Sequence, residues 1–328
     1  MTDVSIALVP LVLVGVYQFG WYALAVLVMS VGGAVLTEYL FTKLLKKKLT
    51  ITDGSAVVTG LLLGLSLPAG VPLWLPLIGS VFAILVVKCL FGGIGQNFVN
   101  PALAARAMLV ASWPALMTTF SPSREMQDSW IPWLAKQAQS IGFHVADVAS
   151  GGTADASSVA TPLASVDGVL ASWPANSTEF LAKFFGYATG VIGEVSVLAI
   201  LLAATYLFVR KVIRPLMPLV FLGSFSFFAW LWLGNGGLFT GNVLAELMFG
   251  GVLFVAFFMV TDYSTSPMTK AGQIIFAAAA GFLTVVIRAF GSYPEGVTYA
   301  VLMMNLCVPL IDRLIVPRAF GVKKVKHD

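Results

Sequence analysis

The stretch SAVVTGLLLGLSLPAG, residues 55–70, decides how the chain folds. It is apolar enough to enter a bilayer, but a membrane-spanning helix needs about 20 apolar residues, and this segment is shorter and rich in glycine. Non-helical backbone at membrane depth has to be enclosed by protein. The stretch therefore predicts a half-helix or a buried broken helix, and not a rod that faces lipid.

The whole chain has the composition of a membrane protein. Of its 328 residues, 59% are hydrophobic and 10% are charged, whereas charged residues make up about 25% of a soluble domain. Long apolar runs between short charged patches predict an all-α polytopic membrane protein and exclude soluble folds. Ten stretches are candidate spans, at about residues 4–19, 20–41, 55–69, 72–91, 100–117, 189–209, 215–233, 242–260, 272–290 and 296–314.

Lysine and arginine residues set the expected orientation. If the N-terminus is inside, thirteen of the 19 fall in cytoplasmic loops and the tail and three fall outside, while Lys88, Arg106 and Arg288 lie within spans. By the positive-inside rule, both termini are cytoplasmic. The basic clusters therefore mark loop ends and a tail beside anionic membrane lipid, and no nucleic-acid partner is expected.

The spans divide into two groups of five around one long polar loop. Residues 1–117 are expected to form the first membrane half and residues 189–314 the second. Residues 118–188 form an extracytoplasmic loop between them, and residues 315–328 a basic cytoplasmic tail. Because five is odd, two halves of similar build would be inverted relative to each other, as in many transporter folds.

Ionisable and amide side chains near the broken segments are the candidate functional residues. Charged groups in a membrane are costly and suggest function, although each one alone is equally an interfacial charge or a helix cap. Asn97 and Asn100 in GQNFVNPA can hold a polar ring or an ion, or simply satisfy unpaired backbone groups. Glu194 is a further hypothetical member of an ion path. The candidates for an ion path, or for a cofactor site in the membrane part beside any cofactor on the long loop, are Asp53, Thr59, Asn97, Asn100, Arg106 and Asp262.

The chain offers neither a metal centre nor a catalytic residue of its own. Cys89 and Cys307 lie in apolar runs, without a cysteine or histidine at ligand spacing. Since an iron–sulfur cluster is held by about four thiolates, we interpret both as small buried hydrophobic residues.

The long loop contains SSVATPLASV, residues 157–166. Thr161 precedes Pro162, which favours an extended backbone, and its small neighbours leave the hydroxyl open to a modifying enzyme. Composition alone favours a flexible linker rich in serine, threonine and alanine.

Five blocks of sequence, in this order, match a known family: TDGSAVVTGLLLGLSLP, GGIGQNFVNPALAARAM, VIGEVS, TDYSTSPMT and SYPEGVTYAVLMMN. The chain resembles the D subunits of bacterial Rnf electron-transport complexes, which are related to the B subunits of sodium-pumping NADH:quinone reductases. The resemblance covers nearly the whole chain. It implies ten helices in two inverted halves, similar to urea transporters, in the bacterial inner membrane.

The same resemblance implies two flavins. One is FMN, joined by a phosphoester to a threonine that faces the outside and attached by a flavin transferase. The matching threonine is Thr161, and Val159 stands where the family pattern most often has glycine. The second is riboflavin, held noncovalently in the membrane part. The residues expected around the covalent flavin are Asp155, Ser158, Ala160, Pro162, Glu194, Arg288 and Glu295.

The implied function is that of an electron-carrying subunit in an ion-pumping ferredoxin:NAD⁺ oxidoreductase. Such a subunit is not catalytic alone, and works with the other Rnf subunits to move Na⁺ or H⁺. The alternative within the family is the equivalent subunit of a sodium-pumping NADH:quinone reductase. A third reading, from a different class, is a solute channel or transporter with a urea-transporter-like fold. The length of the chain favours the Rnf subunit.

Overall fold

The structure is a computed structural model that describes residues 1–46, 53–93, 95–118, 120, 177–187, 190–234, 238–291 and 296–315. Within these residues the chain is mainly helical, and an isolated bridge pairs Pro68 with Val191. The predicted fold class, a helical membrane protein, is therefore confirmed. The predicted residues that lie outside the described part are Asp155, Ser158, Val159, Ala160, Thr161, Pro162 and Glu295.

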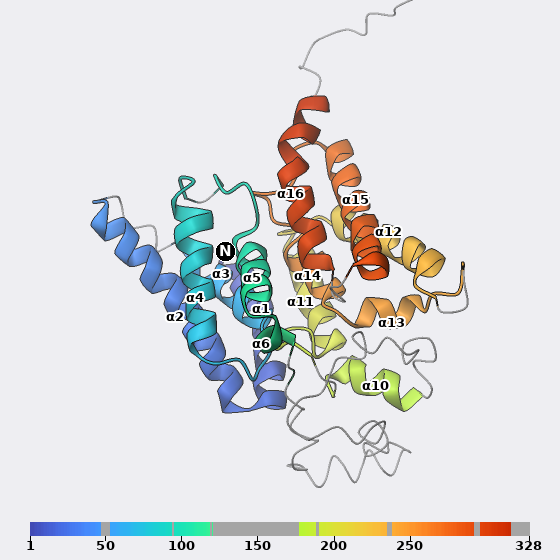
Figure 1. Ribbon diagram of the computed structural model, residues 1–328, viewed down its shortest axis with the longest axis horizontal. Helices are drawn as coiled ribbons and strands as arrows, with labels where there is room; N and C mark the ends of the chain where they lie inside the picture. The colour runs from blue at the N-terminus through green and yellow to red at the C-terminus, as the bar shows by residue number, and fades with distance from the viewer. Residues whose placement is uncertain are drawn as a thin grey trace, which may run out of the picture.

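The helices form two bundles that lie side by side (Figure 1). The first contains α1 (Thr2–Phe19), α2 (Trp21–Leu44), α3 (Ser55–Leu65), α4 (Trp74–Val81), η2 (Phe82–Cys89), α5 (Pro101–Ser112) and α6 (Pro114–Thr118). The second contains α10 (Ser177–Phe185), α11 (Val197–Val209), α12 (Leu216–Trp232), α13 (Val243–Met248), α14 (Val252–Phe258), α15 (Lys270–Phe290) and α16 (Val297–Leu314).

The packing pattern is similar in the two bundles. In the first, α2 packs against α3 and α4; in the second, α12 packs against α14 and α15. The bundles meet where α1 packs against α11 and where α5 packs against α16. One apolar core, which includes Leu8, Leu63 and Phe221, runs through both bundles.

Four of the described helices are long and apolar enough to cross a membrane, namely α1, α2, α15 and α16. Shorter apolar helices cover Ser55–Leu65, Trp74–Cys89, Pro101–Ser112, Val197–Val209 and Leu216–Trp232. Large apolar side chains on the outside stay exposed, including Leu13 (64%) and Val28 (59%). Because a contiguous exposed apolar surface calls for an apolar environment, these faces suit contact with lipid.

The predicted short third segment is confirmed, because α3 ends at Leu65 after 11 residues. The backbone carbonyls at the end of α3 accept hydrogen bonds from a second non-helical segment, far along the chain. Ile192 N–H donates to Leu67 O at 3.1 Å, and Gly193 N–H donates to Leu65 O at 2.7 Å. A Cβ on Gly193 would lie 2.9 Å from that same Leu65 oxygen, so glycine permits this approach.

Several helices differ in detail from the predicted spans. Residues 189–209 become helical only at Val197, and residues 242–260 are interrupted between α13 and α14, where Gly250 and Gly251 have positive φ. The predicted span 72–91 changes from an α-helix to a π-helix at Phe82. The loop 118–188 contains a helix that the sequence did not predict, α10. Apolar composition predicts that a segment is buried, but it does not reveal where the helix breaks.

Candidate functional site

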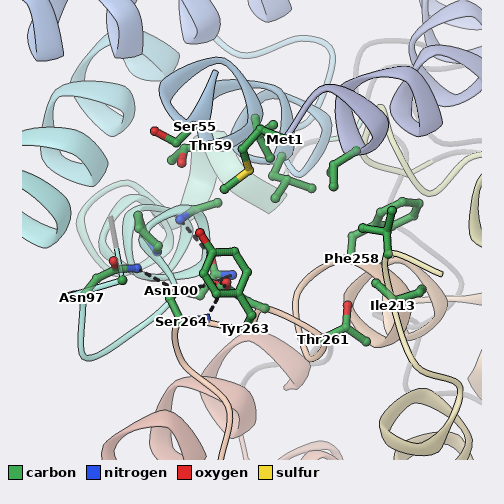
Figure 2. Close-up of a pocket in the computed structure, with 18 of the residues that line it drawn as sticks. Met1, Ser55, Thr59, Asn97, Asn100, Ile213, Phe258, Thr261, Tyr263 and Ser264 are labelled. Carbon is green, nitrogen blue, oxygen red and sulfur yellow. Dashed lines mark hydrogen bonds between the residues drawn. The ribbon is translucent and has the colours of Figure 1, made fainter. Parts of the chain in front are cut away.

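A pocket lies where the starts of α3 and α5 face the segment that joins α14 to α15 (Figure 2). Apolar side chains line part of it, including Val58, Leu207 and Phe258. Thr59, Asn97, Asn100, Lys88, Asp262 and Ser264 supply polar groups. Figure 2 shows Asn97 and Asn100 on one side, Thr59 and Ser55 on another, and Phe258 and Ile213 opposite the two asparagines.

Asn100 links the start of α5 to the segment after α14. Its Oδ1 caps the helix by accepting from the backbone N–H groups of Ala102 (3.0 Å) and Leu103 (3.2 Å), and Pro101 occupies the first helical turn. Its Nδ2 donates to Asp262 Oδ2 at 3.3 Å. The interpretation of Asn100 as a residue that satisfies helix backbone is therefore confirmed, and Asn100 also borders the pocket.

Asp262 organises the other side of the pocket. Its Oδ1 accepts from the backbone N–H and the hydroxyl of Ser264, at 3.2 and 3.0 Å. Asn97 Nδ2 donates to the same Ser264 hydroxyl at 3.3 Å. Burial raises the pKa of Asp262 above its ordinary value, and the hydrogen bonds from Ser264 and Thr265 offset only part of that rise. The sequence-predicted residues Asn97, Asn100 and Asp262 are thus joined in one network, with Thr59 on the same pocket.

A second buried network adjoins the pocket through Lys88 and Ser55. Lys88 Nζ, at the end of η2, lies 2.9 Å from each carboxylate oxygen of Glu38 on α2 and also donates to Ser55 Oγ. Ser55 in turn donates to Asp53 Oδ1, by its hydroxyl at 2.6 Å and its backbone N–H at 2.8 Å. Asp53 was predicted as a site residue, whereas Glu38, Ser55 and Lys88 were not.

A third cluster surrounds the break between α13 and α14. Arg288 on α15 donates to Glu246 Oε2 at 2.5 Å and to its backbone oxygen at 2.9 Å. It also donates to the backbone oxygens of Phe249 (3.1 Å) and Gly250 (3.4 Å). Arg288 therefore supplies hydrogen bonds to backbone carbonyls at the point where the helix is interrupted.

Glu194 and Arg106 also approach this break, at Gly251. A Cβ on Gly251 would lie 2.8 Å from Glu194 Oε2 and 3.8 Å from Arg106 Nη1. Lys183 on α10 donates to the Glu194 backbone oxygen at 3.3 Å and lies 4.7 Å from the centre of the Phe249 ring. Burial lowers the pKa of Lys183, and the nearby Glu194 carboxylate opposes that change. We call the cluster of Arg106, Lys183, Glu194, Glu246 and Arg288 the break cluster.

The comparison with known proteins covers nearly the whole chain. A family model described as "NQR2, RnfD, RnfE family" matches residues 1–321. The chain belongs to this family.

Family members of similar length share more than a third of its residues. The chain is 42% identical to the D subunit of the Na⁺-translocating ferredoxin:NAD⁺ oxidoreductase complex of Acetobacterium woodii, over 100% of this chain and 92% of the relative. It is 40% identical to the D subunit of the proton-translocating ferredoxin:NAD⁺ oxidoreductase complex of Clostridium ljungdahlii, over 99% and 92%. It is 36% identical to the D subunit of the ion-translocating oxidoreductase complex of an Escherichia coli strain, over 99% and 94%.

The sequence-predicted residues of this family member fall into two places. Asp53, Thr59, Asn97, Asn100 and Asp262 lie at or beside the pocket, whereas Arg106, Glu194 and Arg288 lie in the break cluster. The sequence-based prediction missed Glu38, Lys88, Lys183 and Glu246. The sequence did indicate three of them, because Glu38, Lys88 and Glu246 are charged residues within apolar runs. Their pairing was not visible, because Glu38 and Lys88 are 50 positions apart.

Proposed function

We propose that the chain is an electron-carrying membrane subunit of an ion-translocating ferredoxin:NAD⁺ oxidoreductase complex. The observation that carries this proposal is the full-length similarity to the D subunit of the Acetobacterium woodii complex. The partners are the other subunits of such a complex and the surrounding membrane lipid. The transported ion is Na⁺ or H⁺, in keeping with relatives that are named for each.

The proposed membrane arrangement is ten crossings in two inverted halves, residues 1–117 and 189–314, with both termini in the cytoplasm and residues 118–188 outside. Two features support it. Helices of the two bundles pair with each other, α1 with α11 and α5 with α16. Each bundle also has a broken segment, after α3 in one and between α13 and α14 in the other. A urea-transporter-like fold is part of the same proposal.

The proposed covalent cofactor is FMN, held outside the membrane by a phosphoester to Thr161. The ring carries the redox chemistry, and the protein supplies position and electrostatics. The helix that ends the loop supports a place near the break cluster: Phe180 and Phe184 of α10 pack with Val197, Met248 and Phe249. This packing brings the end of the loop beside Glu194 and Arg288. The other proposed neighbours are Asp155, Ser158, Ala160, Pro162 and Glu295.

The pocket is the proposed place for the noncovalent flavin, riboflavin. Ligand sites are usually apolar with a few polar groups that fix orientation, and the pocket has this character. Phe257 and Phe258 offer an apolar wall for a flat ring, and the amides of Asn97 and Asn100 offer both donors and acceptors for its polar edge.

In-gel flavin fluorescence of the denatured chain tests whether FMN is attached covalently to Thr161. The protein is made together with a flavin transferase, as wild type, as Thr161→Ala, and as the matched control Thr153→Ala in the same loop. Wild type and the control should fluoresce, and Thr161→Ala should be dark, because only a covalent flavin survives denaturation. A wild-type band without fluorescence would contradict the covalent cofactor and favour a transport protein.

A further inference from the structure

The hydrogen bonds that link Glu38, Lys88, Ser55 and Asp53 have a defined direction when both carboxylates and the ammonium group are charged. An ammonium group can only donate, so Lys88 donates both to Glu38 and to Ser55 Oγ. A carboxylate can only accept, so the Ser55 hydroxyl directs its own proton towards Asp53 Oδ1, 2.6 Å away. The Ser55 hydroxyl thus connects Lys88 to Asp53, and a rotation of this hydroxyl turns its proton from Asp53 to Lys88, as inward proton transfer requires.

The chain of bonds runs from the interior to the end of the helices. Glu38 is 1% exposed, Lys88 4% and Ser55 5%, whereas Asp53 is only half-buried and lies before the first turn of α3. The Asp53 carboxylate also affects Tyr263, which lines the pocket. Burial raises the pKa of the Tyr263 phenol, and the negative charges of Asp262 and Asp53 raise it further. In the proposed topology this end of the bundle faces the cytoplasm.

The buried pair adjoins the pocket. Lys88 and Ser55 both line it, so a charge that enters the pocket acts on them in surroundings of low polarity. Lys88 is the last residue but one of the π-helix η2, and π-helical turns occur frequently at functional sites. Charged groups on the elements around η2 point elsewhere: Lys43 of α2 lies over the Tyr39 ring, and Arg106 of α5 approaches Gly251. Across the pocket, Asp262 is bonded to Ser264 and Asn100.

We propose that Asp53, Ser55 and Lys88 form a proton relay from the cytoplasmic surface to Glu38, which takes up one proton when negative charge enters the pocket. The proposal rests on the proposed function, because that function places an electron carrier in the pocket. At rest, the Glu38 carboxylate and the Lys88 ammonium together have no net charge. An added electron would leave an uncompensated negative charge beside them, and burying such a charge is costly.

Each transfer in the relay balances. Lys88 gives one proton to a Glu38 oxygen, which becomes a neutral carboxyl group. The Ser55 hydroxyl then turns from Asp53 to the neutral Lys88 amine, gives it a proton, and receives one from Asp53, which has taken it from cytoplasmic water. The pair then carries one positive charge, located on Lys88, which compensates the electron. Reoxidation reverses every step and returns the proton to water.

Ser55→Ala in the purified full-length chain, with its flavins bound and in lipid nanodiscs, tests the relay. A pH indicator follows proton uptake after rapid photochemical reduction, and acid extraction measures the noncovalent flavin in the same sample. We expect uptake by Ser55→Ala to be slower by about two orders of magnitude, the lower end of what a positioned proton donor contributes. Ser66→Ala is the matched control, because Ser66 is also buried but its hydroxyl donates to the backbone oxygen of Leu63.

A second variant and a second measurement keep the test decisive even if Ser55→Ala does not fold. Asp53→Asn leaves the buried pair intact and removes the surface acceptor, so it should slow uptake in the same way. Infrared difference spectra should show a new protonated carboxyl band on reduction in wild type, absent in Glu38→Gln. Wild-type uptake rates in flavin-loaded Ser55→Ala and Asp53→Asn would overturn the relay. A wild-type chain that holds no noncovalent flavin would instead overturn the proposed carrier in the pocket.

Discussion

The pocket and the break cluster both bury charged groups, but they differ in what those groups bond. In the break cluster, Arg288 donates to backbone oxygens of Glu246, Phe249 and Gly250, so its hydrogen bonds hold an interrupted helix. At the pocket, Asp262 accepts from the Ser264 backbone N–H but also from the side chains of Ser264 and Asn100, and it borders a cavity. A buried charge in this protein can thus bond mainly to backbone oxygens, as Arg288 does, or mainly to side chains at the edge of a cavity, as Asp262 does.

The largest expected effect of a substitution is on the break cluster. Arg288→Met should lower the free energy of unfolding by about 3–5 kcal/mol, because it leaves Glu246 as an uncompensated buried charge. Arg210→Met is the control: Arg210 pairs with Asp3 at the surface, where its side chain is 56% exposed, and such pairs contribute about 0–1 kcal/mol. Detergent-denaturation titrations measure both. Equal losses in the two variants would remove the distinction between a structural break cluster and an ordinary surface ion pair.

A smaller loss of stability is expected at the glycine that Glu194 and Arg106 approach. Gly251→Ala places a methyl group 2.8 Å from Glu194 Oε2, on a backbone with φ of 70°. We expect a loss of about 1–3 kcal/mol from this strained conformation and the displaced carboxylate. Gly32→Ala, on α2, meets nothing within 4 Å and should be neutral or stabilising. The same denaturation titration measures both variants. If Gly251→Ala unfolds with the same free energy as wild type, Glu194 can move away freely.

The smallest effect on stability is expected at the pocket, where binding should change more. Asn97→Ala removes one hydrogen bond of 3.3 Å and should cost no more than about 1 kcal/mol. Asn100→Ala also removes the cap of α5 and should cost about 1–2 kcal/mol. Both variants should lose noncovalent flavin, measured by acid extraction per mole of chain. Full flavin content in Asn97→Ala, together with a large loss of stability, would make the pocket resemble the break cluster.

Local sequence was sufficient to predict the helical class, and it singled out residues that the structure brings together at the pocket and in the break cluster. The apolar runs located the buried segments, and the short glycine-rich stretch at 55–70 predicted the broken third segment. Asn97, Asn100 and Asp262 stood out because each is polar and lies at a Gly- or Pro-rich interruption between apolar runs. A residue of this kind has few roles open to it, so its sequence context carries much of the information.

Pairings between distant segments were beyond such reasoning. Glu38 and Lys88 lie in different helices, and nothing in either local sequence states that α2 and η2 place them in contact. The same holds for Arg288 and Glu246. The change to a π-helix at Phe82 was also hidden, because an α-helix and a π-helix have similar apolar composition. These features depend on tertiary packing, which periodicity alone does not encode.

The hydrogen bonds between the two broken segments constrain how the protein is made. The carbonyls of Leu65 and Leu67 are bonded by Gly193 and Ile192, which leave the ribosome only after the entire long loop. Until those residues arrive, the carbonyls need water, since hydrocarbon offers no alternative partner. The hydrogen bonds of this broken end are therefore completed late, once the start of the second bundle has been synthesised.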